Sequence, residues 1–308
     1  MDKIYKFLDK NHFEYFVDYD ISNISAIKIG SIAKLVIFPK TTIELEKLLM
    51  FFGAIKVRFD VFGNLSNVLF MSGISYPIIV TNKMNEEIYI ENSRVRVSAG
   101  MMLPKFAEIM RKNNLSGVEG LIGIPATIGG AIKNNAGAFG FSISDKLLSV
   151  KVYFKGKIFN LKKNEIKFSY HYSNLNTFVI LEASFLFEIK NEYDIIDLSN
   201  KFTYLRGKTQ PMGLSLGSVF KKVNGKSAGF FIERSGMKGF REGGIMVSNK
   251  HANFFVNDKS GSASDFLHLL RIVQARVEKQ FGVWLVPEIE KVGDFNETFS
   301  RPSYTFKI

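Results

Sequence analysis

Residues 117–140 read GVEGLIGIPATIGGAIKNNAGAFG, a stretch that packs glycines, small residues and asparagines between apolar anchors. Because glycine permits positive φ and close approach of the backbone, such a segment suits a diphosphate or an isoalloxazine ring that is bound largely by main-chain N–H groups. Composition alone leaves a second reading, a tight structural corner where small residues let two strands pack. The order of the residues decides between the two.

That order resembles the flavin-binding signature of the UDP-N-acetylenolpyruvoylglucosamine reductase family, whose FAD domain is of the PCMH or vanillyl-alcohol-oxidase type. A match over this length is far more specific than a lone G-x-G-x-x-G. Ala126 replaces a usual glycine and Asn134 replaces a frequent methionine, and both changes are small or polar. The resemblance implies that FAD is contacted by Gly123, Ile124, Pro125, Thr127, Gly129, Gly130, Asn135 and Gly137.

A second loop, at residues 63–67, lies between the apolar runs 55–62 and 68–71, which we expect to be strands. It resembles the family's L-G-x-G-S-N turn for the flavin diphosphate. The resemblance implies cofactor contacts from Gly63, Asn64, Ser66 and Asn67. Leu65 replaces a glycine of that turn, so close backbone approach is less expected there.

The composition indicates an ordered cytoplasmic protein. The 308 residues are long enough for two or three compact units, with 46% hydrophobic and 23% charged residues. No cysteine is present, which excludes disulfides, thiolate catalysis and thiolate metal sites, and no metal site is predicted. The N-terminus lacks the pattern of a signal peptide, and no apolar run approaches the roughly 20 residues that span a bilayer.

The net charge of +12 is compatible with nucleic acid, a membrane surface or anionic small molecules. Basic residues are spread among acidic neighbours, and no helix-turn-helix, zinc or RNP pattern is present. We therefore expect no nucleic-acid partner, no membrane insertion and a monomer whose ligands are anionic.

Local patterns predict an α+β protein. A capping box at Thr41 and Glu44 begins one helix, and Ser262 and Asp265 begin another that ends before Gly282. We also expect a strand at 88–98, a helix at 104–112, a hairpin at 150–161 and a strand at 178–189. Residues 190–197 read as a crossing between domains. With the resemblance, this gives a two-part FAD-binding PCMH-type α/β domain over 1–195, split near 70–80, and a C-terminal substrate-binding α+β domain over 196–308.

The segment R206-G-K-T-Q-P…G217-S-V-F-K resembles the family's R-x-x-x-Q-P…S-x-G-S-[VI]-F-K. There the serine after glycine is the proton donor, a position that Ser218 occupies. Serine is a poor acid alone, so this role needs a hydrogen-bond network and a nearby flavin. Arg206 and Lys221 are candidates for the substrate diphosphate, because cations in a groove bind phosphate well.

Glu288, in W284-L-V-P-E-I, matches the second acid of the family's terminal L-E-P-E-[VI] motif, and Val286 replaces the first. The resemblance implies that Glu288 stabilises or protonates an enol. Without it, Glu288 is a solvated strand-end glutamate. His251 and Asn253 are further candidates for lining the site, although a strand-end histidine bonded to the backbone is the simpler expectation.

Tyr170-His171-Tyr172-Ser173 stands where the family has Y-R-x-S, whose arginine pairs with the substrate carboxylate. Tyr170 is a candidate for substrate binding and His171 for catalysis. A guanidinium is always charged and bidentate, whereas an imidazole is charged only part of the time near neutral pH. Two readings stay open: His171 does the same work less rigidly, or catalysis is impaired.

The resemblance implies that NADPH reduces bound FAD and that UDP-N-acetylglucosamine enolpyruvate is then reduced to UDP-N-acetylmuramate, in peptidoglycan precursor synthesis. One alternative is another FAD oxidoreductase of the same superfamily. A second is a non-catalytic flavin or nucleotide-sugar binding protein, which the replaced arginine favours and the retention of Ser218 and Glu288 disfavours.

Overall fold

The computed structural model describes residues 1–293, so the aromatic and basic tail 294–308 lies outside the described residues. The chain divides into two compact units. The first comprises residues 1–19, 33–65 and 75–208, and the second comprises 20–32, 66–74 and the chain from 209 onward. Two short segments of the N-terminal third therefore belong to the C-terminal unit.

The first unit contains a four-stranded sheet of order β1-β2-β5-β3 and a five-stranded sheet of order β12-β11-β15-β7-β6. β2 and β3 both run parallel to β5. The larger sheet is antiparallel throughout. The elements of this unit are α1 (Asp2–Lys10), β1 (Glu14–Asp20), β2 (Ile32–Phe38), α2 (Thr42–Ala54), β3 (Asp60–Phe62), β5 (Pro77–Val80), β6 (Ile88–Glu91), β7 (Arg94–Ser98), α3 (Leu103–Lys112), β8 (Leu115–Ser116), α4 (Ile128–Lys133), β9 (Gly137–Ala138), β10 (Phe141–Ser142), β11 (Leu147–Phe154), β12 (Lys157–Lys162), β13 (Phe168–Ser169), β14 (Tyr172–Ser173), β15 (Val179–Leu186), β16 (Glu188–Ile189) and α5 (Glu192–Thr209).

This unit has two hydrophobic cores. One lies under the smaller sheet, where Leu45, Leu48 and Phe52 of α2 pack. The other lies under the larger sheet and includes the apolar residues of the glycine-rich segment. The first unit therefore has two separate hydrophobic cores, and the predicted split of the first domain near 70–80 stays a prediction.

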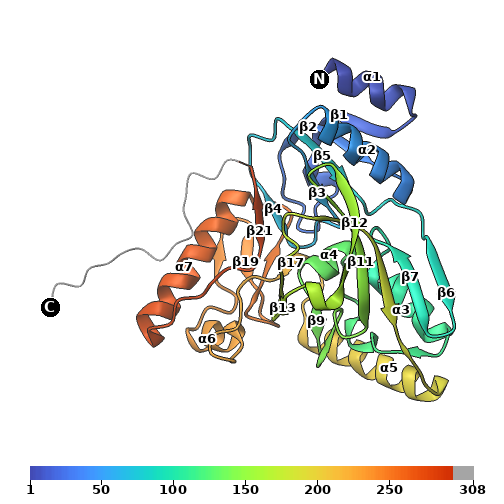
Figure 1. Cartoon of the computed structure of the whole chain (residues 1–308). Coiled ribbons are helices and arrows are strands. Elements are labelled where there is room, and N and C mark those ends of the chain that lie inside the picture. The colour runs from blue at the N-terminus through green and yellow to red at the C-terminus, as the bar shows by residue number, and fades with distance from the viewer. Residues whose placement is uncertain (294–308) are drawn as a thin grey trace. The chain divides into compact units, whose positions relative to one another are not determined.

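The second unit contains a four-stranded sheet of order β17-β20-β19-β18. Figure 1 shows α7 alongside these strands, and α7 contacts β18 and β19. A strand from early in the chain, β4, pairs in parallel with the last described strand, β21. The elements are β4 (Val68–Phe70), β17 (Leu214–Ser218), α6 (Ala228–Arg234), β18 (Arg241–Glu242), β19 (Ile245–Val247), β20 (Phe254–Asn257), α7 (Ala263–Phe281) and β21 (Glu290–Val292).

The mixture of helices, a partly parallel sheet and antiparallel sheets confirms the α+β class. Three local expectations differ from the structure. Residues 88–98 form a hairpin instead of one strand, because Asn92 takes a φ of 55° at the turn. The expected strand 55–62 is reduced to 60–62, because α2 extends to Ala54 and Ile55 caps it.

The third difference concerns residues 190–197, which begin helix α5 and do not form a crossing. The predicted division after residue 195 falls inside this helix, whereas the first compact unit continues to Lys208. Phe202 explains the difference: its ring stacks on Phe139 at 5.0 Å and lies edge-on to Phe141 at 5.6 Å, which fastens α5 to the first unit. Within residues 1–293, no helix is both long and apolar enough to cross a membrane.

Candidate functional site

The glycine-rich segment runs from β8 through a 3-10 helix at Glu119–Leu121 into the short helix α4. Thr127 caps α4, because its Oγ1 accepts the N–H of Gly130 at 3.2 Å. Before this cap, Gly123 and Pro125 are exposed, and Gly123 has a φ of +81°. The main chain of this turn is therefore open to a ligand, as expected for a segment that binds through its backbone.

The loop at Gly63 lies directly against the cap of α4. A Cβ on Gly63 would stand 2.2 Å from Thr127 Oγ1, so only glycine fits there. Asn64 adds a bond from its Nδ2 to the carbonyl of Pro125 at 2.9 Å. The two stretches predicted to bind the cofactor thus meet within the first unit, although about sixty residues separate them in the chain.

Leu65, which replaces a family glycine, takes a φ of 53° and is 2% exposed. A left-handed conformation costs a non-glycine residue about 1–2 kcal/mol. Burial of a leucine side chain contributes about 1.5–3 kcal/mol, which offsets that cost. Leu65 therefore holds a left-handed conformation in this loop with its side chain buried.

Close packing against Ala99 leaves little room for a side chain at Gly129. Its N–H donates to the carbonyl of Ala99 at 2.8 Å, and a Cβ would stand 3.0 Å from the Cβ of Ala99. This contact fastens the first turn of α4 to the chain just after β7. Gly137 is similarly close to the carbonyl of Phe141, at 3.0 Å from a built Cβ.

Asn135 links the glycine-rich segment to the hairpin β13–β14. Its Nδ2 donates to the carbonyl of Ser169 at 2.8 Å. Its Oδ1 is buried and has no hydrogen-bond partner among residues 1–293. A buried amide oxygen without a partner is costly, so this atom is a natural acceptor for a bound group.

The hairpin β13–β14 presents Tyr170 and His171 at its tip. His171 has a φ of 47°, and its ring stacks on Tyr170 with 4.0 Å between centroids. Ser173, which is fully buried, donates from its Oγ to the carbonyl of Lys133 at 2.7 Å. Ser173 was not predicted as a site residue, although it is the last residue of the Y-x-x-S pattern that pointed to His171.

Arg206, on α5, lies beside the same segment. Its Nη2 donates to the carbonyl of Gly120 at 3.4 Å, and its guanidinium lies 5.5 Å from the ring centre of Phe139. Burial lowers its pKa, but an arginine stays protonated in a protein. A Cβ on Gly123 would stand 3.0 Å from Arg206 Cδ, so the cation is adjacent to the open turn.

In the second unit, Ser218 and Glu288 lie on two backbone segments that hydrogen-bond to each other. Ser218 ends β17 after Gly217, whose φ is +76°. The N–H of Glu288 donates to the carbonyl of Val219 at 2.9 Å. The N–H of Lys221 donates to the carbonyl of Val286 at 2.9 Å. Ser218, Lys221 and Glu288 are therefore neighbours along two paired segments.

Asn67 also lies in the second unit. Its Nδ2 donates to the carbonyl of Glu288 at 3.1 Å, and its own carbonyl accepts the N–H of Glu290 at 2.8 Å. These bonds attach Glu288 to the chain that precedes β4. Ser66, the preceding residue, is half-buried in a turn of the same unit. A contact between Asn67 and a cofactor stays a prediction.

His251 and Asn253 complete this region. The Nδ1 of His251 accepts the N–H of Asn253 at 3.2 Å, which confirms the expectation of a histidine bonded to the backbone. Burial lowers the pKa of His251. The carboxamide of Asn253 bonds to the backbone of Phe220, next to the segment that carries Ser218.

The site residues therefore form two groups, one in each unit. The first unit holds the glycine-rich residues with Gly63, Asn64, Tyr170, His171 and Arg206, and the second holds Ser66, Asn67, Ser218, Lys221 and Glu288. The first group offers a ligand the exposed turn at Gly123 and the buried side-chain oxygen of Asn135, and Gly63 packs the two loops against each other. The second group brings the side chains of Ser218, Lys221 and Glu288 onto two backbone segments that hydrogen-bond to each other.

Two family models match the chain. Residues 33–161 match an FAD binding domain, and residues 210–292 match the C-terminal domain of UDP-N-acetylenolpyruvoylglucosamine reductase. The first match spans the Gly63 loop and the glycine-rich segment, and the second spans Ser218, Lys221 and Glu288.

Similar proteins cover nearly the whole chain. The UDP-N-acetylenolpyruvoylglucosamine reductase of Caldicellulosiruptor saccharolyticus is 35% identical over 295 residues, which are 94% of this chain and 95% of that protein. The protein of the same name from Prochlorococcus marinus is 35% identical over 285 residues, which are 89% and 95% of the two chains.

A solved structure agrees with these relatives. The crystal structure of UDP-N-acetylenolpyruvylglucosamine reductase from Thermus caldophilus superimposes with a TM-score of 0.76 at 29% identity, over 91% of this chain and 98% of that chain. The chain therefore belongs to the UDP-N-acetylenolpyruvoylglucosamine reductase family.

Proposed function

We propose that this protein uses FAD and NADPH to reduce UDP-N-acetylglucosamine enolpyruvate to UDP-N-acetylmuramate, a step in peptidoglycan precursor synthesis. The net reaction adds a hydride to C3 and a proton to C2 of the enolpyruvyl group, and NADPH is oxidised to NADP⁺. FAD, when bound, supplies the hydride chemistry. The protein residues orient the substrate and handle the proton.

The second unit supplies the proton. Ser218 Oγ donates a proton to C2, and Glu288 stabilises the enol that precedes this transfer. The observation that best supports this pairing is the 2.9 Å bond between the N–H of Glu288 and the carbonyl of Val219. Val219 directly follows Ser218, so this bond brings the backbone of Glu288 next to that of the proton donor. Lys221, on the same segment, binds the substrate diphosphate.

The first unit holds the cofactor and the substrate carboxylate. The main chain at Gly123, Gly129 and Gly130 binds FAD with Gly63, Asn64 and Thr127, and Asn135 Oδ1 accepts a hydrogen bond from it. His171 donates a hydrogen bond to the substrate carboxylate in place of the family arginine, with Tyr170 beside it. Arg206 neutralises a phosphate near the open turn.

The enzyme acts as a monomer in the cytoplasm. Its ligands, NADPH, FAD and a UDP-sugar, are all anionic, in keeping with the net charge of +12. The preference for NADPH over NADH is part of the proposal and is tested by supplying each reductant in turn.

Anaerobic stopped-flow absorbance of the flavin near ~450 nm tests the proposal in two steps. We expect NADPH to bleach bound flavin and the enolpyruvyl sugar nucleotide to restore the absorbance. Bleaching without reoxidation would indicate a flavin protein with another acceptor. Absence of bleaching would indicate a protein that binds flavin without this reductase activity.

His171 has its own prediction. Replacing it by alanine removes the donor to the substrate carboxylate, so His171→Ala should slow reoxidation by substrate by roughly 10- to 100-fold and leave reduction by NADPH nearly unchanged. His171→Arg restores the family residue and should reoxidise at least as fast as the wild type. Equal effects of His171→Ala on both half-reactions would contradict the assignment.

A further inference from the structure

One buried side chain holds the backbone from which Ser218 projects. Asn253 is 4% exposed. Its Oδ1 accepts the N–H of Phe220 at 3.0 Å, and its Nδ2 donates to the carbonyl of Phe220 at 2.8 Å. Its own carbonyl accepts the N–H of Val219 at 2.8 Å. Three hydrogen bonds from one residue therefore fix the two residues after Ser218.

These bonds replace a strand ladder that is irregular at this point. Leu214 and Ser215 of β17 pair in register with β20, but the register shifts before the next pair, Ser218 with Phe254. A carboxamide that both donates to and accepts from one residue imitates a hydrogen-bonded strand pair. Asn253 thus supplies the pairing that a regular ladder would otherwise give to Phe220.

The same segment carries Glu288. The carbonyl of Val219 accepts the N–H of Glu288, and Phe220 forms a β-bridge with Pro287. Val219 and Phe220 are both buried, at 0% and 1% exposure, so little freedom is left to their side chains. A rotation of the Phe220 backbone would therefore move Ser218 and Glu288 relative to each other.

We propose that Asn253 is a positioning residue that holds the Ser218 hydroxyl in register with Glu288. The inference rests on the proposed function, because only there do these two groups act on one substrate. Asn253 acts through the backbone of Phe220 and Val219. A displacement of about 1 Å at a reacting group can cost ~100-fold in rate, so loss of this clamp is costly to proton transfer.

Two substitutions of Asn253 test this. Asn253→Ser shortens the side chain and removes both bonds to Phe220. Asn253→Asp keeps the shape and the acceptor for the Phe220 N–H, but it sets an oxygen against the Phe220 carbonyl, so it provides a second variant where the first folds poorly.

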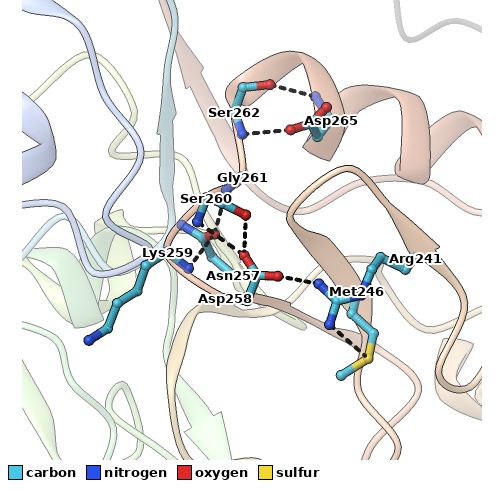
Figure 2. Close-up of polar contacts among 9 residues, drawn as sticks. All are labelled: Arg241, Met246, Asn257, Asp258, Lys259, Ser260, Gly261, Ser262 and Asp265. Carbon is cyan, nitrogen blue, oxygen red and sulfur yellow. Dashed lines mark hydrogen bonds and ion pairs between the residues drawn. The ribbon is translucent and has the colours of Figure 1, made fainter.

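Asn257, the last residue of β20, offers a matched control, because Asn253 directly precedes that strand. It is 6% exposed, its Nδ2 donates to the carbonyl of Ile27 at 2.8 Å, and its Oδ1 accepts the N–H of Gly261 at 2.9 Å. Figure 2 shows this amide oxygen bonded to the turn at Lys259 and Gly261. Asn257→Ser therefore removes similar buried bonds without touching Val219 or Phe220.

The two flavin half-reactions are measured separately under anaerobic conditions. We expect Asn253→Ser to slow reoxidation by the enolpyruvyl sugar nucleotide by roughly 10- to 100-fold and to change reduction by NADPH by less than about twofold. Asn257→Ser should leave the ratio of the two rates at the wild-type value. In a Ser218→Ala background, Asn253→Ser should have little further effect, because both changes act on one proton transfer.

Hydrogen exchange of the peptides covering 217–221 and 286–289 gives a readout that needs no substrate. Faster exchange in both peptides of Asn253→Ser, and not of Asn257→Ser, supports the clamp. Unchanged exchange, or an effect on reoxidation that is additive with Ser218→Ala, overturns the inference. If the substrate does not reoxidise the flavin of the wild-type protein, the proposed function is wrong, and so is the catalytic part of this inference. The exchange result still decides whether Asn253 holds the backbone of Phe220 and Val219.

Discussion

At Gly63 the absence of a side chain lets two loops of the proposed flavin site pack against each other. A Cβ there would overlap Thr127 Oγ1, and Thr127 is 1% exposed and caps α4. We predict that Gly63→Ala destabilises the fold by about 1–3 kcal/mol, because a well-packed contact must open. It should also weaken FAD retention. Urea denaturation and the flavin absorbance of purified protein measure the two effects.

Gly207 supplies the control for that substitution. It lies in α5, no atom stands within 4 Å of its built Cβ, and its φ is an ordinary one. Gly207→Ala should therefore stabilise the helix by about 0.5–1 kcal/mol. Equal stability and equal FAD content in Gly63→Ala and the wild type would show that the loop and the cap are not in contact.

We predict that His251 makes the free energy of unfolding depend on pH. Burial lowers its pKa in the folded protein, and the nearby Lys238 also lowers it. The unfolded chain then takes up the proton first as the pH falls, so stability is fully present above the unfolded pKa of ~6.5 and declines below it. His251→Asn keeps an acceptor for Asn253 without a titrating ring, and it should lose less stability on acidification.

The free energy of unfolding, measured by urea denaturation from about pH 7.5 to about pH 5.5, tests this sign. Carboxylates elsewhere titrate in both proteins, so only the difference between the two profiles reports on His251. Parallel profiles would mean that the histidine gains its proton equally in the folded and unfolded states.

At the scale of elements, the hairpin β13–β14 depends on two attachments to the chain around α4. Asn135 bonds the carbonyl of Ser169, and Ser173 bonds the carbonyl of Lys133. We predict that Ser173→Ala, which removes the donor to the carbonyl of Lys133, costs about 1–2 kcal/mol in stability. Because the hairpin tip carries His171, the substitution should also raise the KM for the enolpyruvyl substrate with little change in flavin reduction.

Ser169 is the comparison for that prediction, because it is exposed and uses only its backbone carbonyl in the attachment. Ser169→Ala should match the wild type in stability and in KM. A KM that is unchanged in Ser173→Ala would show that the hairpin holds His171 without this bond.

Elements with strong local signals were predictable from the sequence. Thr41 accepts the N–H of Glu44 at the start of α2, and Ser262 forms a capping box with Asp265 at the start of α7. Gly282 ends α7 in the left-handed conformation. These features depend on residues three or four apart, so the sequence carries them directly.

Elements that depend on distant partners were less predictable. The turn at Asn92 that divides 88–98 has no glycine to mark it, and the buried face of α5 packs on rings sixty residues earlier. In the site, the resemblance supplied the residue types, but it gave no sign that Asn67 bonds Glu288 across 221 positions. Such a contact depends on the pairing of β4 with β21, which local patterns do not encode.

At the scale of the whole chain, the second unit depends on the N-terminal third. β21 pairs with β4, Asn257 bonds the carbonyl of Ile27, and Ser31 bonds the carbonyl of Met71. The core of this unit also includes three apolar residues of the early segments, Ile27, Ile29 and Leu69. The family match at 210–292 therefore covers less than the folding unit that contains it.

We predict that residues 209–308, produced alone, do not fold. Burial of three large aliphatic side chains contributes roughly 5 to 9 kcal/mol, which is comparable with the whole stability of an ordinary domain, about 5–15 kcal/mol. The fragment should show no cooperative urea transition and poorly dispersed amide resonances, whereas the full chain should show both a cooperative transition and good dispersion. Adding a peptide of residues 66–74 should restore only part of the structure, because Ile27 and Ile29 are still missing. If the fragment unfolds cooperatively at a urea concentration near the midpoint of the full chain, the early segments are not needed for this unit to fold.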